Sequence, residues 1–136
     1  MSAFHSLTTS YKDRESLVAA LGEQGYHDVE VHDVAQSLEG YHGDVRSQKA
    51  NVIVRRRFVG MASNDLGWEW DAKSGTFIQH ISDYDKGRHN QGWCDSLKQH
   101  YTEKITMKTA AKNGFEFLSK TIVAGRVQLQ FHDRRA

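Results

Sequence analysis

Apolar and polar positions alternate along the middle of the chain in three successive runs, which turn-forming residues separate. The runs and the turns between them are Asn51–Val59, Gly60–Asp65, Leu66–Asp71, Lys73–Gly75 and Thr76–Ile81. Leu66, Trp68 and Trp70 share one parity, which predicts a half-buried strand because successive side chains of a strand point to opposite faces. Neighbouring strands joined by short turns pair antiparallel most simply, so we predict a three-stranded meander.

A first helix is predicted near the N-terminus. Leu17, Val18 and Leu21 lie at helical spacing and form an apolar stripe. Asp13 is suited to cap the start of this helix, because its carboxylate can accept a hydrogen bond from a free amide of the first turn. Gly25 suits the left-handed position just past the helix end.

A second, longer helix is predicted over residues 91–113. Its apolar stripe consists of Trp93, Leu97, Tyr101 and Ile105. Residues four apart lie on neighbouring turns, so these side chains form one broad stripe. Gly114 repeats the exit expected at Gly25.

Strand-like runs flank both helices. They are Phe4–Tyr11, His27–Val34, Phe115–Val123 and Arg126–His132. The last two runs are joined across Ala124 and Gly125. The segment Gln36–Lys49 is polar and contains two glycines, which predicts a loop with room for a short edge strand within it.

The order of the predicted elements is strand, helix, strand, meander, helix, strand, strand. Each amphipathic helix must bury its apolar stripe, and one face of the sheet needs a cover. We therefore predict an α+β fold: a two-layer sandwich in which two helices cover one face of an antiparallel sheet, loosely of the ferredoxin-like type. A chain of 136 residues has the length of one domain, so we expect residues 1–136 to form a single α+β domain.

Composition narrows the class of protein. The single cysteine, Cys94, cannot form an internal disulfide, which favours a reducing compartment. No apolar run has the length of a membrane span, and no signal-peptide core is present, so we expect a cytoplasmic protein with no membrane association. The formal net charge of +1 indicates no global attraction to nucleic acid or to an acidic membrane.

Arg55, Arg56 and Arg57 form the densest basic run. If they lie on a strand, Arg55 and Arg57 share a face and, with Trp68 and Trp70, could form a basic, aromatic strip for RNA or single-stranded DNA. The alternative is that the arginines form salt bridges with acidic residues on neighbouring strands. The candidates for such pairs are Glu69, Asp71 and Asp83.

Asp83 and Asp85 are the best candidates for a metal or acid–base site. On a strand they would share a face, where two carboxylates could bind a divalent cation or act as an acid–base pair. The alternative is a polar strand end with local turn bonding. The eight histidines and Cys94 show none of the close ligand pairs that zinc sites have, so we predict scattered surface histidines and no cofactor.

Several stretches together resemble a known family. They are MSAFHSLTTSYKDRESLVAALGEQGY, EGYHGD, ANVIVRRR, SNDLGWEWDAKSGTF and QHYTEKITMKTAAKNGF. In order and spacing the chain resembles the conserved plastid reading frame that is number thirty-five in its series, a domain of unknown function in cyanobacteria, algal plastids and cyanobacterial viruses (cyanophages). The resemblance implies a cyanobacterial, plastid-stroma or infected-host setting. It implies no catalytic residues, because none is established for that family.

Three functions follow from these patterns. The first is a non-catalytic binding or adaptor module acting through protein partners, because an incomplete sheet can accept a partner strand at its edge. The second is a nucleic-acid-binding protein that uses Arg55, Arg57, Trp68 and Trp70. The third is a metal-assisted enzyme with Asp83 and Asp85 at its centre.

Overall fold

The computed structural model describes residues 2–135, which fall into two compact units divided between Tyr101 and Thr102. Helix α3 (Gln91–Lys112) contributes its first half to the first unit and its second half to the second. Among residues 2–135, no helix is long and apolar enough to cross a membrane. The expectation of one domain over residues 1–136 stays a prediction.

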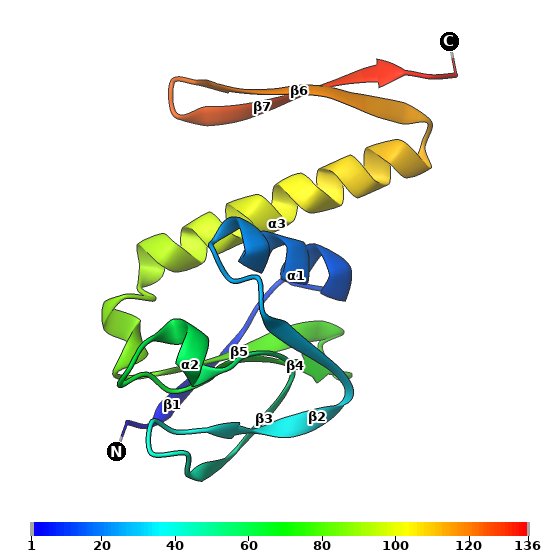
Figure 1. The fold of residues 1–136 in the computed structure, drawn as a ribbon. Coiled ribbons are helices and arrows are strands. Elements are labelled where there is room, and N and C mark those ends of the chain that lie inside the picture. The colour runs from blue at the N-terminus through cyan, green and yellow to red at the C-terminus, as the bar shows by residue number, and fades with distance from the viewer. Residues whose placement is uncertain (1, 136) are drawn as a thin grey trace. The chain divides into compact units, whose positions relative to one another are not determined.

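The first unit contains a five-stranded antiparallel sheet with the strand order β1-β5-β4-β3-β2 (Figure 1). The strands are β1 (Phe4–Thr8), β2 (Val29–Glu39), β3 (Val45–Val54), β4 (Leu66–Asp71) and β5 (Thr76–Ser82). In the chain, helix α1 (Arg14–Glu23) lies between β1 and β2, the short helix α2 (Arg56–Val59) lies between β3 and β4, and the 3-10 turn η1 (Asp85–Gly87) follows β5. The α+β class is therefore confirmed.

Helix α1 begins and ends as its sequence predicts. The carboxylate of Asp13 accepts a hydrogen bond from the amide of Ser16 at 3.0 Å, which caps the first turn. Gly25 follows the helix with a φ of +96°, a backbone conformation that residues with a Cβ rarely adopt.

The helices cover one face of the sheet. Trp68 pairs with Val52 on one side and with Gln79 on the other, so these three side chains share a face. Gln79 donates a hydrogen bond to the sulfur of Cys94 on α3 at 3.5 Å, which places that helix over the same face. The buried apolar residues of the two helices are Leu17, Ala20, Leu21, Leu97 and Tyr101. Figure 1 shows α1 and the first turns of α3 on the same side of the sheet.

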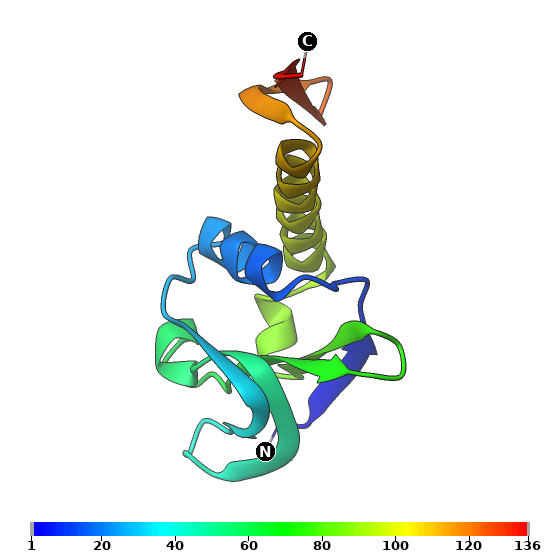
Figure 2. The ribbon, with the colours of Figure 1, turned by 90° about the vertical axis from the view of Figure 1, so that its right-hand side faces the viewer.

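The opposite face is partly covered by the β2–β3 hairpin. Figure 2 shows these cyan and teal strands curling away from the green strands. Leu38 and Ala50 reach over Gly67 of β4, and they form a small apolar cluster with Ile53 against which Phe4 packs. The sheet is therefore curled, and its two faces are covered by different elements.

Two expectations about this unit are wrong. The segment Gln36–Lys49 is not mainly a loop, because β2 and β3 extend through most of it and form a hairpin; the edge strand expected there is the end of β2, the last strand of the sheet. The run Asn51–Val59 is not one strand, because β3 ends at Val54 and α2 follows. The carboxylate of Asp65 accepts a hydrogen bond from the amide of Arg56 at 2.7 Å, which turns the chain out of the sheet at this point.

The second unit consists of the second half of α3 and a hairpin of β6 (Phe115–Val123) and β7 (Arg126–Asp133). Both strands were predicted, and their turn has positive φ at Ala124 and Gly125, as a two-residue hairpin turn requires. They form a separate two-stranded sheet, however, and do not extend the sheet of the first unit.

Candidate functional site

Arg55, a predicted nucleic-acid contact, is held by carboxylates. Its Nε lies 2.9 Å from Glu30 Oε2, and its Nη1 lies 2.9 Å from Oδ2 of the buried Asp65. The hydrogen bond from Arg55 lowers the pKa of Glu30, and the same bond raises the pKa of Arg55. The salt-bridge alternative therefore holds for Arg55, but its partners differ from the predicted ones. They are Glu30, Glu39 and Asp65 and not Glu69, Asp71 or Asp83.

The predicted basic, aromatic strip is not assembled. Trp68 is completely buried and donates its indole N–H to Gln79 Oε1 at 3.1 Å, so no base can stack on it. Trp70 is 44% exposed and packs edge-on against Phe77. Arg57 lies in α2 over the ring of Phe58, so the common strand face expected for Arg55 and Arg57 does not exist.

Asp83 and Asp85 also have separate surroundings. Strand β5 ends at Ser82, so the expected common strand face is wrong. Asp83 is exposed and contacts His5. Asp85 is buried and accepts hydrogen bonds from the amide of Asn64 at 2.9 Å and from the hydroxyl of Ser82 at 2.7 Å. Within residues 2–135, no group of three histidine, cysteine, aspartate or glutamate side chains is placed to hold a metal ion.

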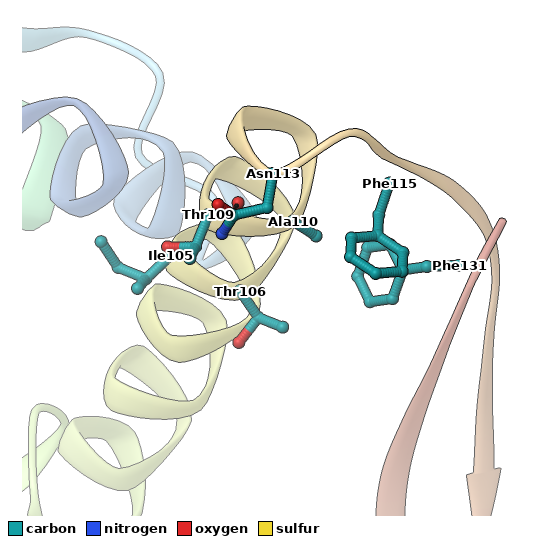
Figure 3. A pocket seen from close by; sticks show the side chains of 7 residues that line it. All are labelled: Ile105, Thr106, Thr109, Ala110, Asn113, Phe115 and Phe131. Carbon is teal, nitrogen blue, oxygen red and sulfur yellow. Dashed lines mark hydrogen bonds between the residues drawn. The ribbon is translucent and has the colours of Figure 1, made fainter. Parts of the chain in front are cut away.

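A surface suited to binding lies in the second unit and was not predicted. It is an open groove of about 620 Å³ between α3 and the β6–β7 hairpin. Its lining residues are Ile105, Thr106, Thr109, Ala110, Asn113, Phe115 and Phe131. Figure 3 shows the two phenylalanine rings on the hairpin side, facing the helical residues. A groove of this volume is within the usual range of ligand-binding sites.

The strand register explains the apolar side of this groove. Phe117 pairs with Phe131, and Ile122 pairs with Val127, so one face of the hairpin is mainly apolar, with Lys120 and Asp133 as its charged members. A bulge at Leu118 shifts the register between these pairs. Alternation in β7 predicted an apolar face, but the sequence contains no local signal that this face lacks a cover.

The second unit has no apolar core of its own. Among the described residues 102–135 no apolar side chain is buried, whereas the first unit contains all the buried apolar residues. Phe117, Leu118, Ile122 and Val123 of β6 are between 41% and 69% exposed. A two-stranded hairpin is at best marginally stable alone, and clustered exposed apolar residues mark interaction sites.

The second unit is also basic. Residues 102–136 contain seven lysines and arginines against three acidic residues, a net charge of +4, whereas residues 1–101 contain eleven against fourteen, a net charge of −3. At the end of the groove, the guanidinium of Arg135 lies 4.9 Å from the centre of the Phe115 ring. Hydrogen bonds from Arg135 lower the pKa of Asp133.

The fold and the groove define an α+β protein with an exposed apolar surface on a basic C-terminal unit. The chain belongs to the family described as Protein of unknown function (DUF1257), whose model matches residues 14–129. No curated protein and no solved structure matches the chain.

Proposed function

We propose that this protein is a binding or adaptor module that acts through a protein partner, and that the partner docks on the groove of the second unit. The observation that supports the proposal is the exposure of Phe117 and Ile122 on the mainly apolar face of the hairpin, while no apolar residue among residues 102–135 is buried. Apolar side chains of a partner entering the groove would be removed from water, which stabilises a complex by about 25 cal/mol per Å² of apolar area.

The partner we propose is an acidic, amphipathic segment of another protein. Its apolar side chains would contact Phe115 and Phe131, while its carboxylates would lie near Arg135, whose guanidinium lies over the Phe115 ring. The net charge of +4 on residues 102–136 supports an acidic partner over a second copy of this unit, because two copies would repel each other. An apolar lining supports a protein over a nucleic acid, whose phosphates require cations along the contact.

The family resemblance supplies the setting for this proposal. It implies a cyanobacterial host, a plastid or a cyanophage-infected cell, so the partner is to be sought in a cyanobacterial lysate.

The proposal is tested by photo-crosslinking in a cyanobacterial lysate, with and without nuclease treatment. The full chain carries benzoylphenylalanine at Thr109, which lines the groove, or at Tyr84, which is 58% exposed in the first unit. We expect cross-links from position 109 to a partner peptide that is acidic and contains regularly spaced apolar residues. The change Phe131→Ser should abolish them, and Phe131→Leu should retain them.

Three outcomes would overturn the proposal. Cross-links from position 109 to a second copy of this chain would identify the groove as a self-association surface. Loss of the partner after nuclease treatment would indicate a nucleic-acid contact. Equal capture of one partner from positions 109 and 84, unaffected by Phe131→Ser, would place binding elsewhere.

A synthetic peptide of the cross-linked segment should bind more weakly when its acidic residues are replaced by amides.

A further inference from the structure

Three side chains on the face of the sheet away from α1 form a continuous hydrogen-bonded chain. The hydroxyl of Ser6 lies 2.7 Å from Nδ1 of His80, and Nε2 of the same ring lies 2.9 Å from Oε1 of Glu69. One imidazole therefore joins a hydroxyl to a carboxylate. This is the arrangement of a nucleophile, its general base and the group that orients the base.

Strand pairing brings Ser6 and His80 together. They are direct partners in the β1–β5 register. The amide of Asp83 donates to the carbonyl of Ala3 at 2.9 Å, which makes that position a hydrogen-bonded pair. Since such pairs alternate along an antiparallel ladder, Ser6 and His80 occupy a non-hydrogen-bonded pair, where opposite side chains approach most closely.

Glu69 reaches the same ring from β4. Gly67 is the direct partner of His80, and Glu69 lies two residues further along on the same face. A diagonal neighbour at this position is within reach of a long side chain. Because Gly67 has no side chain, nothing on β4 directly opposite His80 competes with this contact.

The accessibility of the three groups suits a reaction at Ser6. Ser6 is exposed on its edge strand, whereas His80 is 4% exposed. An ionised Glu69 can only accept a hydrogen bond, so it holds the ring hydrogen on Nε2 and leaves Nδ1 to accept the proton of the Ser6 hydroxyl.

The backbone of β1 adds a hydrogen-bond donor. Strand β1 is at the edge of the described sheet. Because Ser6 is in a non-hydrogen-bonded pair, its own amide points away from β5 towards the open edge. An N–H at the nucleophile itself can stabilise the negative charge that develops on a carbonyl oxygen during attack.

We propose that Ser6 is a nucleophile activated by His80 and oriented through Glu69, and that it accepts acyl groups from esters at the edge of β1. The Ser6 oxygen forms a bond to the carbonyl carbon while its proton passes to His80. The bond from that carbon to the leaving alkoxide then breaks, and the alkoxide takes the proton from His80. Water repeats the sequence to release the acid and regenerate Ser6.

The proposed reaction is an activity of the first unit. It is independent of the binding function proposed for the second unit. Ser6 lies outside residues 14–129, over which the family model matches, so the reaction is proposed for this chain and not for the family.

The test uses a fluorophosphonate probe on the full chain, followed by mapping of the modified peptide by mass spectrometry. Attack by Ser6 forms an oxygen–phosphorus bond and releases fluoride, with the hydroxyl proton passing to His80. We expect labelling at Ser6, none in Ser6→Ala, and a rate lower by about 100-fold or more in His80→Gln, the range typical for loss of a general base.

Two variants separate activation from folding. Glu69→Gln, at a side chain that is 36% exposed, should retain the fold by circular dichroism yet slow labelling and shift its pH profile. Ser47→Ala removes another exposed strand hydroxyl, and it should leave labelling of Ser6 unchanged. Absence of labelling at Ser6 in the folded wild-type chain would overturn the proposal. Labelling at an equal rate in folded Glu69→Gln and His80→Gln would do so as well, because Ser6 would then react without activation.

Discussion

Nη1 of Arg55 lies 2.9 Å from Oδ2 of Asp65, and the side chain of Asp65 is completely buried. The same carboxylate accepts hydrogen bonds from the amides of Glu39 and Arg56, both at 2.7 Å. One buried side chain thus joins the end of β2, the start of α2 and the residue that follows β3. We infer that Arg55 stabilises the fold and is not available for a nucleic-acid phosphate.

Replacing Asp65 by alanine should destabilise the first unit by about 3–5 kcal/mol, because it leaves these two amides without their acceptor, at about 1–3 kcal/mol each, and removes one of the three carboxylates that pair with Arg55. The free energy of unfolding in urea measures this change. The matched control is Asp33→Ala, which breaks an exposed pair with Arg14 at 3.1 Å and should cost below about 1 kcal/mol. Equal effects of the two changes would contradict the structural role of Asp65.

The two tryptophans of β4 should respond differently to truncation. Trp68→Ala should lower the free energy of unfolding by about 3–5 kcal/mol, because the indole is completely buried and loses its bond to Gln79. Trp70→Ala should lower it by only about 1–2 kcal/mol, because Trp70 is 44% exposed. Urea unfolding of the two variants compares them, and a larger effect of Trp70→Ala would show that the burial order is wrong.

Gly67 should not tolerate a Cβ. A methyl group at this position would lie 2.8 Å from the Cβ of Ala50 and 2.8 Å from Cδ2 of Leu38. Overpacking of this kind costs about 1–3 kcal/mol, so Gly67→Ala should lower the thermal midpoint. Gly87→Ala is the control, because nothing lies within 4 Å of a Cβ there, and it should change stability by at most about 0.5 kcal/mol. A neutral Gly67→Ala would mean that the hairpin does not close over β4.

Stability should fall as the pH is lowered through the titration of His89. Burial lowers the pKa of this histidine from its ordinary value of 6.5; the charge of Arg88 acts in the same direction, and Asp85 opposes both. In the neutral ring, Nδ1 donates to the carbonyl of Asp85 at 3.2 Å and Nε2 accepts from the hydroxyl of Tyr26 at 2.6 Å.

Since the unfolded chain binds the proton more readily than the folded one, this contribution is complete above pH 6.5 and is lost as the pH falls through the lower, folded pKa. Thermal midpoints measured from about pH 8 to about pH 5 should therefore decline less in His89→Gln than in the wild type. The exposed His42→Gln should keep the wild-type profile. Identical profiles for all three proteins would exclude His89 as the group responsible.

Elements with a complete local pattern were predicted correctly. Helix α1 has an N-cap at Asp13, an apolar stripe and a glycine exit, and β4 alternates strictly. The β2–β3 hairpin was missed over residues 36–49, because it curls over the sheet and only Leu38 and Gly40 are buried within that range. Its polar exposed residues therefore have the composition of a loop.

For the candidate site residues too, the contacts between distant segments were not predicted. Arg55 and Asp65 are ten residues apart, and nothing in the intervening turn signals that they form a buried pair. The groove of the second unit requires residues of α3 to face Phe115 and Phe131, and that arrangement depends on where the chain reverses after Asn113. A strand period identifies an apolar face but not whether another element covers it.

By itself the sequence determined the α+β class, helices α1 and α3 with their ends, strands β4 and β5 of the meander, and the two strands of the C-terminal hairpin. These features depend on side-chain periodicity and capping, which act over a few residues. Only the tertiary structure decided that Arg55 pairs with carboxylates, that Trp68 is buried while Trp70 is not, and that Ser6 forms a hydrogen bond with His80. Each of those outcomes depends on pairing between segments distant in the chain, where register and burial select among contacts that are locally equivalent.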